Sequence, residues 1–176
     1  MQCDDGVTIR RLVTLEEPDV AQLAAVLIDC VEGGASVSFM HPLDPARAAE
    51  FWRRQADDVR DGARMLFVAS DEAGIVGTVQ VVSAWPENQP HRADVEKMLV
   101  HSRARGRGIG VALMRAAEDA ARVAGKMLLV LDTATGSEAE RFYQRLGWIS
   151  AGIIPDYALW PRGGFCNATF YYRKLA

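Results

Sequence analysis

In the first half of the chain, hydrophobic residues recur in some stretches with the two-residue period of strands and in others with the spacing of helices. Residues 7–13 hold β-branched side chains and two arginines, which predicts a short edge strand. Over 20–28 the apolar residues recur at helical spacing, and Gly33 is expected to end that helix. A second amphipathic helix is predicted over 44–59, with Asp44 as its cap. The segment 35–40 between them is either a flexible flap or a plain connector.

The pattern changes in the middle of the chain. Two apolar runs at 65–69 and 75–82, joined by turn residues, predict a β-hairpin. A further strand is expected over 93–100, with the even-numbered residues from Asp94 to Val100 on one face. Asp94 and Glu96 would then point the same way. Such a pair is a solvated strand face or, less commonly, the site of a general base.

A strand, a glycine-rich turn, a helix and another strand follow in order. The helix is predicted over 111–124, and the apolar run 126–131 is typical of a buried strand parallel to the one before the glycines. A last helix over 138–146 and a pair of strands within 148–176 complete the pattern. The sequence therefore predicts an α/β protein with a mixed sheet and one domain spanning 1–176.

Composition and charge narrow the class of function. A net charge of -3 argues against nucleic-acid partners, and no apolar run approaches membrane length. Three cysteines without short spacing, and three histidines without partners at ligand spacing, make a disulfide framework or a metal site unexpected. His91 is the one histidine expected to lie beside Asp94, in a loop that flanks the possible general-base site. The acidic start differs from a signal peptide, and we expect a cytoplasmic protein.

The stretch 103–110, Arg-Ala-Arg-Gly-Arg-Gly-Ile-Gly, predicts an anion site. Glycines let the backbone approach a ligand, and the helix behind them presents free N–H groups. A P-loop is excluded because no Lys-Ser or Lys-Thr pair follows. A dinucleotide-binding turn stays open, since Asp132 ends the next strand where a ribose-binding acid belongs. Against it stand the Gly-x-Gly-x-Gly spacing and the gap of residues 101–105 before the glycines.

Two motifs carry a resemblance to a known family. Arg105-x-x-Gly108-x-Gly110 ahead of a helix resembles the coenzyme A loop of the GCN5-related N-acetyltransferases, the GNAT superfamily. Ala139-x-x-Phe142-Tyr143-x-x-Leu146-Gly147-Trp148 is similar to a later helix of that family. The resemblance implies the GNAT fold, a twisted mixed sheet of about six or seven strands flanked by about four helices. It also implies acetyl-CoA as co-substrate.

A closer resemblance, scattered from residue 33 to the end, is to the tabtoxin resistance acetyltransferases. It implies acetylation of a toxin's amine, and it places the segment 33–40 beside the acceptor. The residues that carry it are Gly33 to Val37, Phe39-Met40, Arg92 to Val95 with Lys97, Leu131 to Thr133, Gly136-Ser137, Pro155, Tyr157 and Ala168-Thr169.

The chemistry of amine acetylation assigns roles to particular side chains. An amine is mostly an ammonium at neutral pH and only its neutral form attacks a thioester, so a base is needed. Asp94, Glu96 and Asp132 are the candidates, and the resemblance favours Asp94 and Asp132. The family has Glu where Asp94 stands, and the shorter side chain leaves two roles open, proton acceptor or binder of the cationic acceptor. Tyr143 is the expected proton donor to the departing sulfur.

The remaining candidates follow from the resemblance and the strand order. A backbone N–H in 98–100 is expected to stabilise the oxyanion. The expected substrate-binding residues are Phe39, Met40, Asp94, Glu96 and Asp132. The expected cofactor-binding residues are Met98, Leu99, Val100, Arg105, Gly106, Arg107, Gly108, Ile109, Gly110, Ser137 and Tyr143.

The leading hypothesis is an enzyme that transfers acetyl from acetyl-CoA directly to a small-molecule amine, without a covalent acyl-enzyme and without a metal. The tail loop over 155–164 is long enough to cover a groove, which favours a small acceptor. Two rivals remain, a non-catalytic coenzyme A-binding module and a nicotinamide-dependent protein. A homodimer is compatible with the fold.

Overall fold

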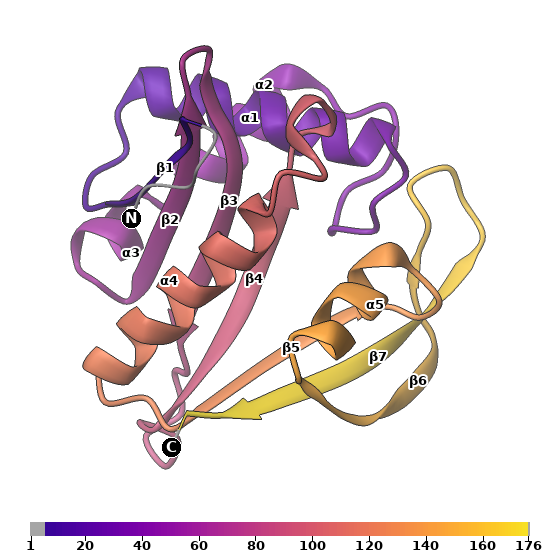
Figure 1. Cartoon of the computed structure of the whole chain (residues 1–176). Helices are drawn as coiled ribbons and strands as arrows, with labels where there is room; N and C mark the ends of the chain where they lie inside the picture. Colours follow the sequence, from indigo (N-terminus) through magenta and orange to yellow (C-terminus); the bar gives the residue numbers. More distant parts are fainter. Residues whose placement is uncertain (1–5, 176) are drawn as a thin grey trace.

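The computed structural model describes residues 6–175, so Cys3 lies outside the described residues. Figure 1 shows one twisted sheet with helices packed on both faces. The elements in chain order are β1 (Thr8–Leu12), α1 (Glu17–Glu32), α2 (Pro45–Arg53), α3 (Ala56–Arg60), β2 (Arg64–Asp71), β3 (Gly74–Ser83), β4 (Arg92–Val100), the 3-10 helix η1 (Ser102–Ala104), α4 (Ile109–Val123), β5 (Leu128–Ala134), α5 (Glu138–Arg145), β6 (Ile149–Leu159) and β7 (Phe165–Lys174).

The sheet has seven strands in the order β1-β2-β3-β4-β5-β7-β6. Neighbouring strands are antiparallel except β4 and β5, which are parallel and are joined through α4. One apolar cluster joins the sheet to α4 and α5, and a second joins the opposite face to α1 and α2. The predicted mixed sheet, edge strand, hairpin and strand-helix-strand unit are confirmed. The dinucleotide-binding alternative is wrong, because that fold needs a mostly parallel sheet.

The predicted helix over 44–59 is interrupted. It begins as expected, with Asp44 accepting a hydrogen bond from the Arg47 N–H at 3.0 Å. It then ends at Arg53, and α3 starts at Ala56. The Gln55 side chain between them is buried and accepts a hydrogen bond from Gln80 at 2.6 Å. This contact with the sheet accompanies the break, and helical periodicity alone does not reveal it.

A β-bulge interrupts β4 at Lys97. Lys97 has a φ of 48°, in the left-handed region of backbone conformation that residues other than glycine rarely adopt. The pairing with β3 shifts between Thr78 and Gln80, opposite the bulge. An extra residue in one strand changes which side chains face each side of the sheet.

The bulge corrects the predicted faces of β4. Simple alternation put the even-numbered residues of 94–100 together on one face. Instead, Met98 and Val100 pack with the apolar cluster that contains Val95, and Leu99 packs with the opposite cluster. The carboxyl half of β4 is therefore turned over relative to its amino half.

β4 and β5 separate beyond their first residues. Among the described residues, their paired register covers only Arg92–Asp94 with Leu128–Val130. Figure 1 shows the two strands meeting at one end and diverging toward the loop that leads into α4. This divergence opens the sheet at the carboxyl end of β4. Within residues 6–175, no helix is long and apolar enough to cross a membrane.

The two predicted strands of the tail are β6 and β7. β6 continues to Leu159, so much of the predicted covering loop over 155–164 is strand, and the connecting turn is only 160–164. That turn still lies against the segment after α1, because the His41 N–H donates to the Pro161 carbonyl at 2.8 Å and the Ser36 hydroxyl donates to the Leu159 carbonyl at 3.1 Å.

Candidate active site

A cavity of about 690 Å³ lies where β4 and β5 diverge. Its walls come from the segment after α1, from the carboxyl ends of both strands, from the glycine loop and from α5. The lining residues are Cys30, 33–38, 95–100, 104–106, 108–111, 132–134, 137–139, 142–143, Arg145 and Trp160.

The glycine loop forms one wall of this cavity, as the sequence predicts. Gly106 and Gly108 have φ angles of 79° and 72°, so the loop uses the left-handed region twice before α4 begins. Gly110 serves a different purpose. A Cβ built there would lie 3.2 Å from the Met98 Cε and 3.2 Å from the Phe142 Cζ. Gly110 therefore allows the start of α4 to pack closely against Met98 and Phe142. The loop at Gly106 and Gly108, which lines the cavity, can present free N–H groups to anionic groups of a ligand.

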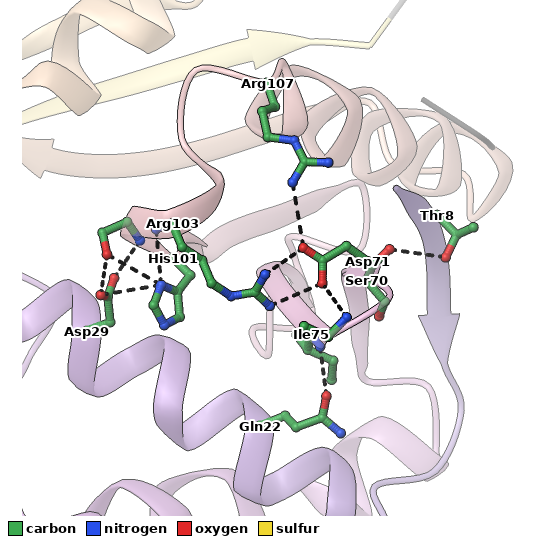
Figure 2. A network of polar contacts seen from close by, with 11 residues as sticks. Thr8, Gln22, Asp29, Ser70, Asp71, Ile75, His101, Arg103 and Arg107 are labelled. Atoms are coloured by element: carbon green, nitrogen blue, oxygen red, sulfur yellow. Dashed lines mark hydrogen bonds and ion pairs between the residues drawn. The ribbon is translucent and has the colours of Figure 1, made fainter. Parts of the chain in front are cut away.

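The three arginines of the loop have different surroundings. Arg105 lines the cavity and donates from Nε to the Val100 carbonyl at 3.2 Å. Arg103 forms two hydrogen bonds to Asp71, at 2.6 and 3.2 Å, and Arg107 lies 3.6 Å from the same carboxylate (Figure 2). Arg107 was predicted to bind the cofactor but is not among the residues that line the cavity.

A second contact fixes the start of the loop. The Asp29 carboxylate on α1 accepts hydrogen bonds from the Ser102 N–H at 2.7 Å and from the Ser102 hydroxyl at 2.6 Å. His101 lies 3.4 Å from the same carboxylate (Figure 2). Asp29 and Asp71 therefore hold the loop against α1 and the β2-β3 hairpin, which pre-organises its N–H groups.

Asp132 lies where two cavities meet. It lines the main cavity and also a smaller one of about 200 Å³, which is bordered by Tyr157 of β6 and Cys166 of β7. Desolvation raises the pKa of Asp132, while the positive charge of Lys97 opposes that shift. A carboxyl group with a raised pKa, beside a space for a second molecule, can accept a proton or bind a cation.

The two carboxylates predicted on β4 do share a face but have different neighbours. Asp94 pairs with Arg92 at 2.6 Å and does not line the cavity. Glu96 lines the cavity and pairs with Arg64 at 2.9 Å. Both have a weak electrostatic influence on Asp132, raising its pKa. Of the three candidate carboxylates, Asp132 alone lines both cavities.

Tyr143 lies on α5 and is buried against the cavity wall. Its ring packs edge-on against Phe142 and Trp148, with centroids 5.3 and 6.0 Å away. Desolvation raises the pKa of Tyr143, and the charge of Asp132 adds to the shift. The phenol therefore stays protonated at neutral pH, as a proton donor must.

The other expected cofactor-binding residues mostly line the same cavity. Met98, Leu99 and Val100 do so from β4, as do the glycines of the loop and Ile109. Ser137 also lines it, but its hydroxyl accepts a hydrogen bond from the Glu140 N–H at 3.1 Å, so it caps α5.

Phe39 and Met40, expected to bind the acceptor, do not line either cavity. Phe39 packs edge-on against Phe51 of α2 at 5.1 Å, and Met40 is exposed. Their neighbours 33–38 line the main cavity instead. His91 lies at the opposite end of β4, where its carbonyl accepts from the Met127 N–H, and it lines neither cavity.

Sequence reasoning missed several residues of the cavity wall. The sequence predicts no role for Lys97 in the site, but the bulge makes it part of the wall. Trp160 arrives from the β6-β7 turn, and Arg145 from the end of α5. The resemblance that included Lys97 is the only signal in the sequence that could have identified it; Trp160 and Arg145 depend on tertiary placement.

Comparison with known proteins agrees with this geometry. The model of the acetyltransferase (GNAT) family matches residues 35–148. An L-methionine sulfoximine/L-methionine sulfone acetyltransferase of Pseudomonas aeruginosa is 30% identical over 140 residues, covering 78% of this chain and 79% of the relative. An uncharacterized N-acetyltransferase of Azospirillum brasilense is 28% identical over 165 residues, covering 90% of this chain and 95% of the relative.

Solved structures share the fold. A phosphinothricin acetyltransferase of Sinorhizobium meliloti in complex with acetyl-CoA has a TM-score of 0.78 at 20% identity, covering 97% of this chain and 89% of the other. The yncA acetyltransferase of Salmonella typhimurium, with its cofactor acetyl-CoA, has a TM-score of 0.77 at 18% identity, covering 98% and 95%. The named relatives point to methionine sulfoximine acetyltransferases rather than to the tabtoxin resistance group. On the family match and the 30% relative together, the chain belongs to the GNAT family of acetyltransferases.

Proposed function

We propose that this enzyme transfers the acetyl group of acetyl-CoA to a primary amine of a small molecule, by direct attack of the amine. The observation that carries the proposal is the common cavity that Asp132 and Tyr143 line from β5 and α5, at the opening between β4 and β5. The glycine loop before α4 and Arg105 beside it line the same cavity and suit the phosphates of coenzyme A.

The reaction needs the chain's residues at three points. Acetyl-CoA supplies the thioester carbonyl. Asp132 either receives a proton from the acceptor's ammonium, directly or through water, or binds that ammonium while water takes its proton. A backbone N–H within 98–100 stabilises the oxyanion. As the new C–N bond forms and the C–S bond breaks, Tyr143 donates its proton to the sulfur and is later reprotonated from solvent.

Asp94 has a secondary role in this proposal. Its pairing with Arg92 and its position outside the cavity support an electrostatic influence on Asp132 rather than contact with the acceptor. Glu96, which lines the cavity, is the better placed of the two β4 carboxylates for contact with a cationic substrate.

A small acceptor suits the covered cavity. The β6-β7 turn is tied to the segment after α1 through Pro161 and Leu159, and Trp160 closes the wall there. Relatives that acetylate methionine sulfoximine or carry the name phosphinothricin acetyltransferase support the same size class. The resemblance to the tabtoxin resistance group makes toxin amines a narrower candidate within it.

Two further expectations belong to this proposal. Buried free thiols at Cys30 and Cys166 suit a reducing cytoplasm. The edge strand β6 exposes Ile149, Ile153 and Leu159, which suits a homodimer. Light scattering of the purified protein tests the dimer.

Two measurements test the transfer reaction. In thermal shift, acetyl-CoA should raise the unfolding midpoint and NADH should not, because only a ligand of the native state stabilises it. Thiol release and the mass of the acetylated product should then be followed over a panel of small amines, including methionine sulfone. Transfer to some of these amines supports the proposal. Tight acetyl-CoA binding with no transfer to any amine would leave a binding module instead.

A further inference from the structure

Lys97 brings a positive charge to the junction of the two cavities. Its Nζ lies 3.5 Å from the Ser38 hydroxyl, and both Ser38 and Asp132 line the main and the smaller cavity. The ammonium also lies 5.5 Å from the centroid of the Phe51 ring, which favours a cation at that position. The bulge that places Lys97 in the cavity wall gives this lysine a strained backbone conformation. Such conformations concentrate at functional sites.

Among residues 6–175, the charge of Lys97 has no close counter-ion. Lys97 is partly buried, and no ion pair within 4.0 Å joins it to a carboxylate of the described residues. Glu96, the nearest acid along the chain, pairs with Arg64 instead. A partly desolvated ammonium without a paired anion carries an energetic cost, which a ligand's anion can offset.

Asp132 has the complementary property. Within residues 6–175 it forms no ion pair within 4.0 Å either, although it and Lys97 influence each other electrostatically. One positive and one negative group therefore border the same space without direct contact. A molecule that bears both charges can satisfy the two groups at once.

We infer that Lys97 binds an anionic group of the acceptor while Asp132 receives its amine, so that this enzyme selects zwitterionic amines over simple amines. The inference rests on the proposed acetyl transfer and adds to it the charge of the substrate. The smaller cavity beside Asp132 takes the rest of the acceptor.

A different role for Lys97 would be that of the base. Desolvation lowers its pKa, as does the charge of Arg64, while the charges of Glu96 and Asp132 raise it. The hydroxyl of Ser38 and the face of Phe51 both suit the ammonium form, and a bound anion would stabilise it further. A base and an anion binder affect kinetics differently, so the two roles can be separated.

The test compares matched acceptors. Several α-amino acids, methionine sulfone among them, are offered beside their α-carboxamides and the corresponding amines that lack the carboxyl group. The amine of a carboxamide is less basic, so more of it is neutral at pH 7, which works against the expected result. Wild-type enzyme should prefer the acids by about 10- to 100-fold in kcat/KM, the range of a charge-assisted hydrogen bond.

Variants assign that preference to Lys97. Lys97→Met should raise KM for the acids by about 10- to 100-fold and leave the amides and simple amines within about twofold. Lys97→Arg should keep part of the preference. Lys174→Met, at an exposed position on β7, is the matched control and should behave as wild type. KM for acetyl-CoA should change in none of them.

The outcomes distinguish the inference from the proposed function. Equal use of acids and amides by the wild type, or an equal loss of kcat for all acceptors in Lys97→Met, overturns the inference but leaves acetyl transfer intact. If no amine is acetylated, calorimetry with the coenzyme A-bound protein decides. If the wild type binds the acids and Lys97→Met does not, the zwitterion site stands without the reaction. If the wild type does not bind the acids, both the inference and the proposed function are overturned.

Discussion

Lys97 and Asp132 border one cavity from β4 and β5, and each opposes the shift in the other's pKa. Desolvation raises the pKa of Asp132, and the positive charge of Lys97 lowers it again. Desolvation lowers the pKa of Lys97, and the negative charge of Asp132 raises it again. The pKa of each group is therefore shifted toward neutrality by desolvation, and the charge of the other group limits that shift.

The raised pKa of Asp132 predicts the acidic side of the pH profile. If the carboxylate form is the active one, kcat/KM rises with pH through a pKa above 3.8, the ordinary value. Asp132→Asn should lower kcat/KM by about 100-fold or more and remove that dependence. Rates from pH 4 to 9 at saturating acetyl-CoA measure it. An unchanged acidic limb in Asp132→Asn would assign the titration to another group.

The same shift has a consequence for stability. A carboxyl group whose folded pKa is raised binds protons more readily in the folded state, so its contribution to stability declines as pH rises through the unfolded and then the folded pKa. Asp132→Asn should therefore unfold at a higher temperature than wild type at pH 7, and this gain should shrink toward pH 4. Thermal unfolding at both pH values checks it. Asp119→Asn, on the exposed side of α4, is the control and should show no such gain.

Tyr143→Phe separates proton donation from packing. The ring remains between Phe142 and Trp148, so the unfolding temperature and the KM for acetyl-CoA should change little. The lost proton donor should lower kcat by about 100- to 10,000-fold. An acceptor-coupled assay of thiol release gives kcat. A kcat within threefold of wild type would mean that water or another group protonates the sulfur.

The sequence predicts those features of the fold that depend on residues close together in the chain. The helix cap at Asp44 and the glycine turn are local, and they were predicted. The bulge at Lys97 was not, because it depends on pairing with β3 rather than on residue type. Without the bulge, the sequence pattern predicts neither which side chains of β4 share a face nor that Lys97 lines the cavity.

Site residues divide in a similar way. Asp132 follows from the end of a strand and Tyr143 from the motif that resembles the family, and the structure places both on one cavity. Phe39, Met40 and Asp94 were expected near the acceptor, yet their side chains are engaged elsewhere or exposed. Nothing in a one-dimensional pattern indicates which neighbours compete for a side chain.

Asp71 is predicted to support cofactor binding without touching the cavity. Its carboxylate, which is partly buried, holds Arg103 with two hydrogen bonds and lies 3.6 Å from Arg107 (Figure 2). The hydrogen bond from Arg103 contributes most to lowering the pKa of Asp71. The hydrogen bond from the Ala73 N–H and the charges of both arginines lower it further. Removing the charge should loosen the loop whose N–H groups we propose to bind the phosphates.

Asp71→Asn should raise KM for acetyl-CoA by about 3- to 10-fold, the range for losing a paired, partly buried charge, while KM for the acceptor stays unchanged. The increase should be larger for acetyl-CoA than for its 3′-dephospho form if Asp71 acts by positioning Arg107 toward that phosphate. Asp57→Asn, which removes an exposed partner of Arg60, controls for surface charge. A KM that rises equally for both cofactor forms would limit Asp71 to the loop backbone, and no rise at all would remove it from cofactor binding.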